Sequence, residues 1–210
     1  MRQKVFVIGL ISLVTVLAIG WYGNARPRFD ATPDTFLLGT VWPDPRPLPE
    51  LELLDHRGAQ IGRDQFKGQW TMMFFGYTSC PDICPTTMLT LRSVVAEMEK
   101  TGAIAPRVAL VTVDPERDDA PTLARYVAHF NEDFIGLRGG DDGLRALSMH
   151  VGAMFEHEAA DENGSYEIAH SASLFLIDPE ARLHAVFSPP HNPADIAEKL
   201  IAIRARYEQG

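Results

Sequence analysis

The chain has very little cysteine and no surplus of positive charge. Cys80 and Cys84 are the only cysteines among 210 residues, which excludes a framework of several disulfides, and a chain of this length does not need one to be stable. Nineteen Lys and Arg face 28 Asp and Glu, a formal net charge of −9, and no run of Lys or Arg offsets that balance. Because binding to nucleic acid requires a basic face, we expect no nucleic-acid partner.

Charge is also absent from a long stretch near the N-terminus. No charged residue stands between Lys4 and Arg26, and this stretch is long enough to span a bilayer and longer than the apolar region of most cleaved signal peptides. Arg2 and Lys4 favour a cytoplasmic N-terminus. We therefore predict that residues 1–25 form a membrane anchor, with a cleaved signal peptide as the alternative. Either way residues 26–210 are exported, to a compartment where a disulfide can persist.

Internal repeats and low-complexity segments are absent as well. Residues 26–49 carry six prolines, which predicts a stiff, extended linker. Residues 50–210 alternate between short apolar runs and helical spacing, and so predict one α/β domain with a central mixed β-sheet flanked by helices. Hairpins are expected at 51–62 and 171–187, strands at 70–77, 107–114 and 134–140, and helices at 85–102, 120–132, 141–155 and 193–207, the last with Asn192 as its N-cap.

The two cysteines stand in the segment CPDICP, residues 80–85, each directly before a proline. A residue before proline avoids the α region, so the segment is predicted to be a tight loop. Pro85 suits the first position of the following helix. Both sulfurs are then expected near a helix N-terminus, where the partial positive charge favours thiolate over thiol.

Four roles are open to such a pair of thiols. A purely structural disulfide across so short a loop would add little stability, and the polar neighbours Ser79 and Asp82 argue against inert buried thiols. Redox exchange and metal binding remain. The C-x-x-x-C spacing is one residue longer than the C-x-x-C of thioredoxin-type exchange, and two thiolates suit a soft ion, Cu(I) above all outside the cytoplasm. A third ligand is then to be sought among the seven histidines.

Three motifs, in the order FGYTSCPDICPTT, VTVDPERDDAPTLARYVAHF and YEIAHSASLFLIDPEARL, resemble the Sco/SenC family of copper-binding assembly proteins. The resemblance runs from about residue 46 to the C-terminus. It implies a thioredoxin-like fold and a copper site, for Cu(I) and also for Cu(II), made by Cys80, Cys84 and His170. It further implies that the protein delivers copper to the binuclear copper site of cytochrome c oxidase subunit II, or keeps that site reduced.

The chain departs from the family beside the expected histidine ligand. Family members commonly carry Asp immediately before it, and this chain has Ala169. If that Asp steadies the imidazole, Glu167 or Asp161 are the candidates to replace it, and a lower metal affinity is the alternative.

Other residues in or near these motifs are expected to be structural rather than metal ligands. Asp114 is expected to end a strand and cap a helix, with an approach to the cysteine loop as the alternative. The segment 157–165, HEAADENGS, is expected to be a mobile loop, with His157 closing over a metal or a partner as the alternative. Met72 and Met73 are expected in the core rather than at a metal.

The sequence thus predicts a copper metallochaperone rather than an enzyme. We expect a single-pass protein of the inner membrane with its soluble domain in the periplasm and a copper-receiving protein as partner. Oxidation of Cys80 and Cys84 to a disulfide would remove the site, so copper loading and redox state should be coupled. The alternative is a periplasmic thiol–disulfide oxidoreductase that reduces partner cysteines. A peroxiredoxin ranks last, since Thr78 stands too close to Cys80 for a Thr-x-x-Cys setting.

Overall fold

The computed structural model describes residue 37 and residues 40–209. The expected membrane anchor, residues 1–25, and most of the expected linker lie outside the described residues. Within the described part of the chain, no helix has both the length and the apolar character that crossing a bilayer requires.

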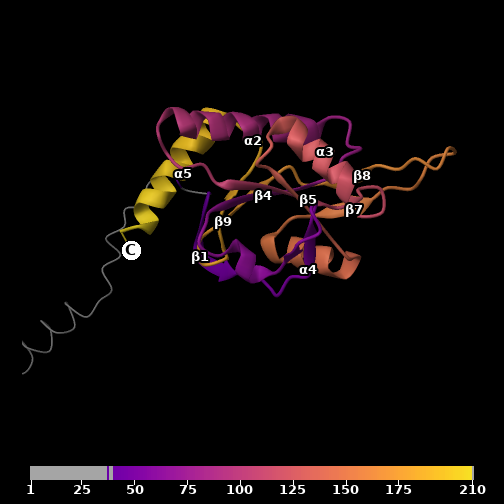
Figure 1. Cartoon of the computed structure of the whole chain (residues 1–210), viewed down its shortest axis with the longest axis horizontal. Helices are drawn as coiled ribbons and strands as arrows, with labels where there is room; N and C mark the ends of the chain where they lie inside the picture. The colour runs from indigo at the N-terminus through magenta and orange to yellow at the C-terminus, as the bar shows by residue number, and fades with distance from the viewer. Residues whose placement is uncertain (1–36, 38–39, 210) are drawn as a thin grey trace, which may run out of the picture. The chain divides into compact units, whose positions relative to one another are not determined.

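An eight-stranded mixed sheet forms the centre of the domain, as Figure 1 shows. The strand order is β1-β10-β9-β4-β5-β6-β2-β3. The central pairs β4–β5 and β5–β6 are parallel, whereas the other neighbouring pairs are antiparallel. The strands are β1 (Val41–Pro47), β2 (Leu53–Asp55), β3 (Gln60–Ile61), β4 (Thr71–Gly76), β5 (Arg107–Thr112), β6 (Ile135–Gly139), β9 (Leu174–Ile177) and β10 (Arg182–Phe187).

Four α-helices of the described chain cover the two faces of this sheet. In Figure 1, α2, α3 and α5 lie above the strands and α4 lies below them. This is a thioredoxin-like α/β fold with a mixed central sheet, as predicted. The helices are α2 (Ile83–Lys100), α3 (Ala120–Phe130), α4 (Asp141–Val151) and α5 (Pro193–Tyr207), with a short 3₁₀ turn, η1, at Arg63–Phe66.

Burial on both faces explains the continuous apolar run of β4. All its residues are buried, as expected of a central strand with helices on either side. Met72 and Met73 are completely buried, which confirms their prediction as core residues. The α5 N-cap is also confirmed, because the Asn192 side chain accepts hydrogen bonds from the backbone N–H groups of Ala194 and Asp195.

Four helix boundaries differ from the prediction by two to four residues. Helix α4 ends at Val151 because Gly152 adopts a left-handed conformation, with φ of 79°, and stops the helix. Helix α2 begins at Ile83 rather than at residue 85. Cys84 therefore lies inside the first turn of the helix and not in the loop before it.

Part of the expected linker is a β-strand. Residues 41–47 form strand β1, which pairs with β10 at the edge of the sheet. This segment holds Pro43, Pro45 and Pro47, and an edge strand accepts proline because its outer side needs no N–H donor. The same extended backbone that suggested a spacer thus serves as an edge strand.

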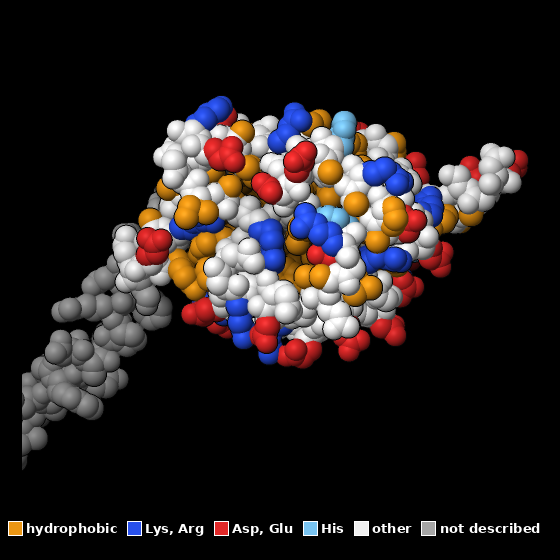
Figure 2. Space-filling view, viewed as in Figure 1, with side chains coloured by type: hydrophobic (Ala, Val, Ile, Leu, Met, Phe, Trp, Pro, Cys, Tyr) orange, Lys and Arg blue, Asp and Glu red, His pale blue; other side chains and the backbone are white. Residues whose placement is uncertain are grey.

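A separate two-stranded sheet flanks the loop expected at 157–165. Residues 158–165 form neither helix nor strand, as predicted, and only His157 belongs to a strand. Strands β7 (Phe155–His157) and β8 (Ile168–His170) pair antiparallel, with Phe155 opposite His170. The two strands and the loop that joins them form a hairpin that projects away from the body of the domain (Figure 1). Its projecting end carries acidic side chains (Figure 2). His170 is the last residue of this hairpin and the point where the chain returns toward the main sheet.

Candidate metal centre

The two cysteines are presented at the end of the central strand β4. The chain leaves β4 after Gly76, makes a short loop and enters α2 at Ile83. Cys80 is half-buried and Cys84 completely buried, and both are free thiols. The Cys80 sulfur accepts a hydrogen bond from the Cys84 backbone N–H at 3.4 Å. The Cys84 sulfur accepts one from the Tyr77 N–H at 3.5 Å.

His170 reaches this loop from the end of β8. Its Nε2 lies 3.2 Å from the Cys84 sulfur, and its ring meets the rings of Phe74 and Tyr77 edge-on, each at 5.8 Å between centroids. On the other side of the ring, Nδ1 lies 3.2 Å from the Ser171 carbonyl oxygen. A proton on Nδ1 can be donated to that carbonyl, which leaves the Nε2 lone pair facing the cysteines. Burial lowers the pKa of His170 and so favours the neutral imidazole.

The two sulfurs and one imidazole nitrogen all lie within 4.8 Å of one another. Bonds from thiolate and imidazole to a first-row metal such as zinc are roughly 2.0–2.3 Å long, so a single ion can contact three atoms at about this spacing. No other group of His, Cys, Asp or Glu in the part of the chain that the structure describes meets the same criterion. A set of two sulfurs and one nitrogen suits a soft ion such as Cu(I).

The predicted activation of both thiols is wrong for Cys84. Burial is the largest influence on this thiol and raises its pKa, while the Tyr77 N–H acts in the opposite direction but more weakly. The charge at the N-terminus of α2 does not compensate for the loss of water around the sulfur. In the metal-free protein Cys84 is therefore a neutral thiol, which can donate its proton toward His170 Nε2.

Hydrogen bonds to Asp118 hold the loop that carries the cysteines, and the sequence reasoning missed this residue. This carboxylate is completely buried and accepts hydrogen bonds from the Thr78 N–H at 3.0 Å and from the Thr78 hydroxyl at 2.5 Å. It also accepts one from the Thr112 hydroxyl at 2.6 Å, which ties the loop to the end of β5. The available signal was the three acids in DPERD, residues 114–118, just after a strand, but the sequence analysis considered only the first of them.

Asp114 lies just beyond the end of β5, as expected, but it caps no helix, since the N-cap of α3 is Asp119. Asp114 is completely buried, forms an ion pair with Arg117 and accepts a hydrogen bond from the Tyr166 hydroxyl at 2.9 Å. His157 is not among the candidate ligands, since its ring stacks on Tyr166 and its Nε2 contacts the Val113 carbonyl oxygen at 3.2 Å. These contacts bind the hairpin to the loop after β5.

The expected replacements for the missing aspartate do not contact His170. Asp161 accepts hydrogen bonds from the N–H groups of Asn163 and Ser165 near the tip of the hairpin, and Glu167 is exposed. The partner of Nδ1 is instead the Ser171 carbonyl oxygen. A backbone acceptor therefore orients the ring where a carboxylate is commonly found.

Comparison with known proteins agrees with this picture. Residues 45–205 match the SCO1/SenC family. A putative copper-binding protein of Stutzerimonas stutzeri is 34% identical over 148 residues, covering 70% of this chain and 72% of that protein. The human mitochondrial SCO2 homolog is 37% identical over 132 residues, covering 62% of this chain but only 50% of the human protein.

Solved structures support the same assignment. Copper-bound ScoI of Bradyrhizobium japonicum matches with a TM-score of 0.66 and 27% identity, over 75% of this chain and 99% of that one. Apo Sco1 of Thermus thermophilus matches with a TM-score of 0.64 and 29% identity, over 80% of this chain and 95% of that one. Because the family match covers most of the chain and includes Cys80, Cys84 and His170, the protein belongs to the SCO1/SenC family.

Proposed function

We propose that this protein binds one Cu(I) ion through the Cys80 and Cys84 thiolates and the His170 imidazole, and passes it on during assembly of cytochrome c oxidase. The observation that carries the proposal is the group of two sulfurs and one nitrogen within 4.8 Å. Relatives described as copper-binding, and copper-bound structures of the same family, support the choice of metal. The recipient that we propose is the binuclear copper site of subunit II.

The chemistry of the three ligands suits transport rather than permanent storage. Both thiols release a proton when they bind the ion, whereas the neutral His170 contributes a lone pair without losing one. Three ligands leave Cu(I) open to a further one. Since Cys80 is the more exposed of the two cysteines, an incoming ligand of the recipient can approach from its side and displace the donors in turn.

The proposed location rests on the N-terminal sequence. The uncharged stretch between Lys4 and Arg26 is long enough for a single-pass anchor. It would hold the copper-binding domain on the periplasmic face of the inner membrane. Labelling of intact cells and of opened spheroplasts with an impermeant amine reagent tests this, because only an exported domain reacts before the inner membrane is broken.

Copper retention by variants tests the proposed site. Full-length protein in detergent is reduced without oxygen, offered excess Cu(I) and desalted, and the copper retained per chain is measured. We expect one copper per chain in the unaltered protein, and lost or clearly weakened retention in Cys80→Ser, Cys84→Ser and His170→Ala, because each change removes one ligand. The exposed His129 on α3 provides the control, since His129→Ala should retain copper as the unaltered protein does. Absence of retained copper in the unaltered protein would refute the proposal.

A thiol–disulfide oxidoreductase is the second candidate, because the two free thiols lie close together within one short loop. Thiolate attack by Cys80 on a partner disulfide would form a mixed disulfide. Cys84 would then attack the Cys80 sulfur and release the partner as two thiols, so two electrons pass from the cysteine pair to the partner. This activity should survive His170→Ala, whereas copper binding should be clearly weakened.

A further inference from the structure

The histidine of the metal centre is carried by an element that is not part of the main sheet. Strands β7 and β8 pair only with each other among the described strands. Cys84 belongs to α2, and backbone pairing with the main sheet therefore does not set its distance from His170. The contacts of the His170 ring with Phe74 and Phe75 of β4 and the side-chain contacts at the root of the hairpin share that role.

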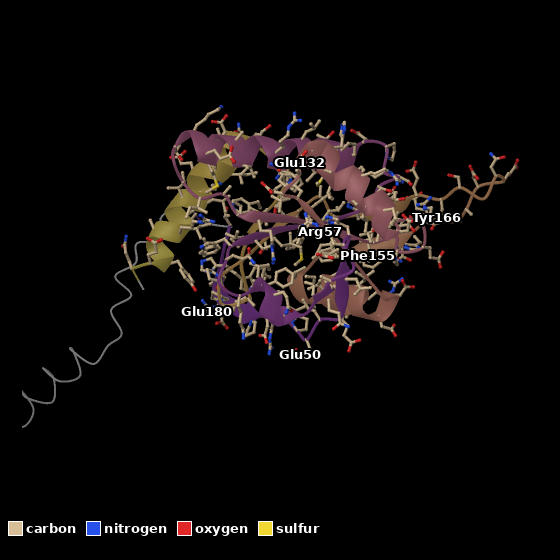
Figure 3. All side chains as sticks on the ribbon, in the orientation of Figure 1. Glu50, Arg57, Glu132, Phe155, Tyr166 and Glu180 are labelled. Carbon is tan, nitrogen blue, oxygen red and sulfur yellow. The ribbon has the colours of Figure 1, made fainter. Side chains whose placement is uncertain are left out.

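Asp114 and Arg117, in the loop after β5, make the contacts at the root through Tyr166. Arg117 forms an ion pair with the completely buried carboxylate of Asp114, and its Nη1 donates to the Tyr166 carbonyl oxygen at 3.0 Å. The guanidinium carbon lies 3.7 Å from the centre of the Tyr166 ring. The Tyr166 hydroxyl in turn donates to Asp114 at 2.9 Å. Figure 3 shows Tyr166 at the root of the projecting hairpin.

Further contacts hold both strands of the hairpin at the same place. On β7, the His157 ring stacks on Tyr166 at 5.7 Å between centroids, and its Nε2 contacts the Val113 carbonyl oxygen at 3.2 Å. On β8, the Ile168 N–H donates to the Tyr77 hydroxyl at 3.3 Å. Tyr77 also packs edge-on against His170, so this network continues directly to the candidate ligand.

We propose that Asp114 and Arg117 are positioning residues for the metal centre, which hold Tyr166 so that β8 presents His170 to Cys84. The metal part of this inference rests on the proposed Cu(I) site. A buried carboxylate without its cation is strongly destabilising. Loss of Arg117 therefore frees the Tyr166 backbone and leaves Asp114 uncompensated, and the hairpin root should loosen.

Arg117→Gln tests the role of the pair. We expect Cu(I) affinity to fall about 10–100-fold, the range typical of groups that orient a metal ligand. In a His170→Ala background the same substitution should have no further effect, because the residue acts only through His170. Competition with a Cu(I) chelator at fixed pH, on full-length reduced protein, measures both effects. Equal losses in the two backgrounds would overturn the proposal.

Arg182→Gln is the matched control. Arg182 pairs with the completely buried Asp178, and its side chain is 29% exposed, the same as Arg117. It is the first residue of β10, at the opposite end of β4 from the cysteines. We expect it to destabilise the fold without weakening Cu(I) binding. A similar loss of affinity in this variant would also overturn the proposal, since general destabilisation would then explain both.

A copper-independent measurement separates this inference from the proposed function. In metal-free protein, Arg117→Gln and the milder Tyr166→Phe should speed hydrogen exchange at the Ile168 amide and shift the NMR resonances of the His170 ring, whereas Arg182→Gln should change neither. If the unaltered protein binds no Cu(I), these shifts still decide whether the pair positions His170. Unchanged exchange and resonances in Arg117→Gln would refute the positioning role.

Discussion

Gly76, the last residue of β4, has no space for a side chain because the metal centre lies directly beside it. A Cβ atom built at this position would lie 2.8 Å from the Cys84 sulfur and 2.8 Å from Cε1 of Phe74. Real Cβ atoms do not approach so closely, and both neighbours belong to the packed core, so one of them must move. The glycine therefore permits Cys84 to sit against the end of the strand.

Gly76→Ala should weaken the metal centre because the added methyl group displaces the Cys84 sulfur. We expect a loss of about 1–3 kcal/mol in the free energy of unfolding, as for other overpacked cores, and a Cu(I) affinity lowered by roughly tenfold or more, equivalent to about 1.4 kcal/mol. Chelator competition and urea unfolding measure the two effects separately.

Gly139→Ala serves as the control for this substitution. A Cβ atom there would lie 2.6 Å from Cδ2 of Leu53, so the crowding is similar, but the site is in β6 and away from the cysteines. It should destabilise the fold and leave Cu(I) affinity unchanged. Unaltered Cu(I) affinity in Gly76→Ala would show that Cys84 is less constrained than we infer.

Sequence reasoning at the residue scale identified groups with distinctive spacing and missed those with ordinary spacing. Cys80 and Cys84 stood out because they are the only cysteines, each followed by proline. His170 could be chosen from the other histidines only through the family resemblance. Arg117 and Asp118 gave no comparable signal, since a charged run after a strand normally faces solvent. Their roles depend on the residues that they contact in the folded protein, Tyr166 for Arg117 and Thr78 for Asp118.

The turn between β9 and β10 is an element whose stability should depend on pH. The completely buried Asp178 accepts hydrogen bonds from the Glu180 and Arg182 N–H groups, and its other oxygen contacts the Arg182 Nε at 2.8 Å and the His184 Nδ1 at 3.3 Å. Burial by itself would raise the pKa of Asp178, but the hydrogen bonds from His184 and Arg182 outweigh burial and hold the pKa below its usual value.

Asp178→Asn should destabilise the protein at neutral pH and much less in acid. A lowered pKa means that the ionised carboxylate stabilises the fold, fully above the usual value of about 3.9 and progressively less as the pH falls below it. We expect a loss of about 1–3 kcal/mol at pH 7, as for hydrogen bonds to a charged group. Urea unfolding of both proteins from pH 7 down to pH 3 measures the difference. A difference that stays constant across this range would contradict the assignment.

At the scale of elements, the regular segments were predictable and the segments that depend on a neighbour were not. The apolar run of β4 and the N-cap at Asn192 carry local signals that the structure confirms. Strand β1 was missed because its prolines suggest a linker unless an edge position is available beside β10. The pairing of β7 with β8 was missed because both strands are short and flank a polar loop, and contacts at the root of the hairpin hold them in place.

The whole molecule places the metal centre where such folds place their ligands. The loops that follow parallel strands in an open α/β sheet meet outside the carboxyl ends of the strands. Here the cysteine loop follows β4, and the loop with Asp114 and Asp118 follows β5, its parallel neighbour. The hairpin brings His170 to the same end. The order of strands and helices was sufficient to predict the fold class, and the family resemblance predicted that His170 joins the cysteines. The place of the loop after β5 beside them needed the three-dimensional structure.

The central claim is that Cys80, Cys84 and His170 together hold one Cu(I) ion. Copper K-edge X-ray absorption of the reduced, Cu(I)-loaded full-length protein tests it most directly, because it reports the atoms bound to the metal. The account predicts two sulfur ligands and one imidazole nitrogen in the unaltered protein, and loss of the imidazole signal with both sulfurs retained in His170→Ala. A spectrum without two sulfurs, or one that His170→Ala leaves unchanged, would contradict it.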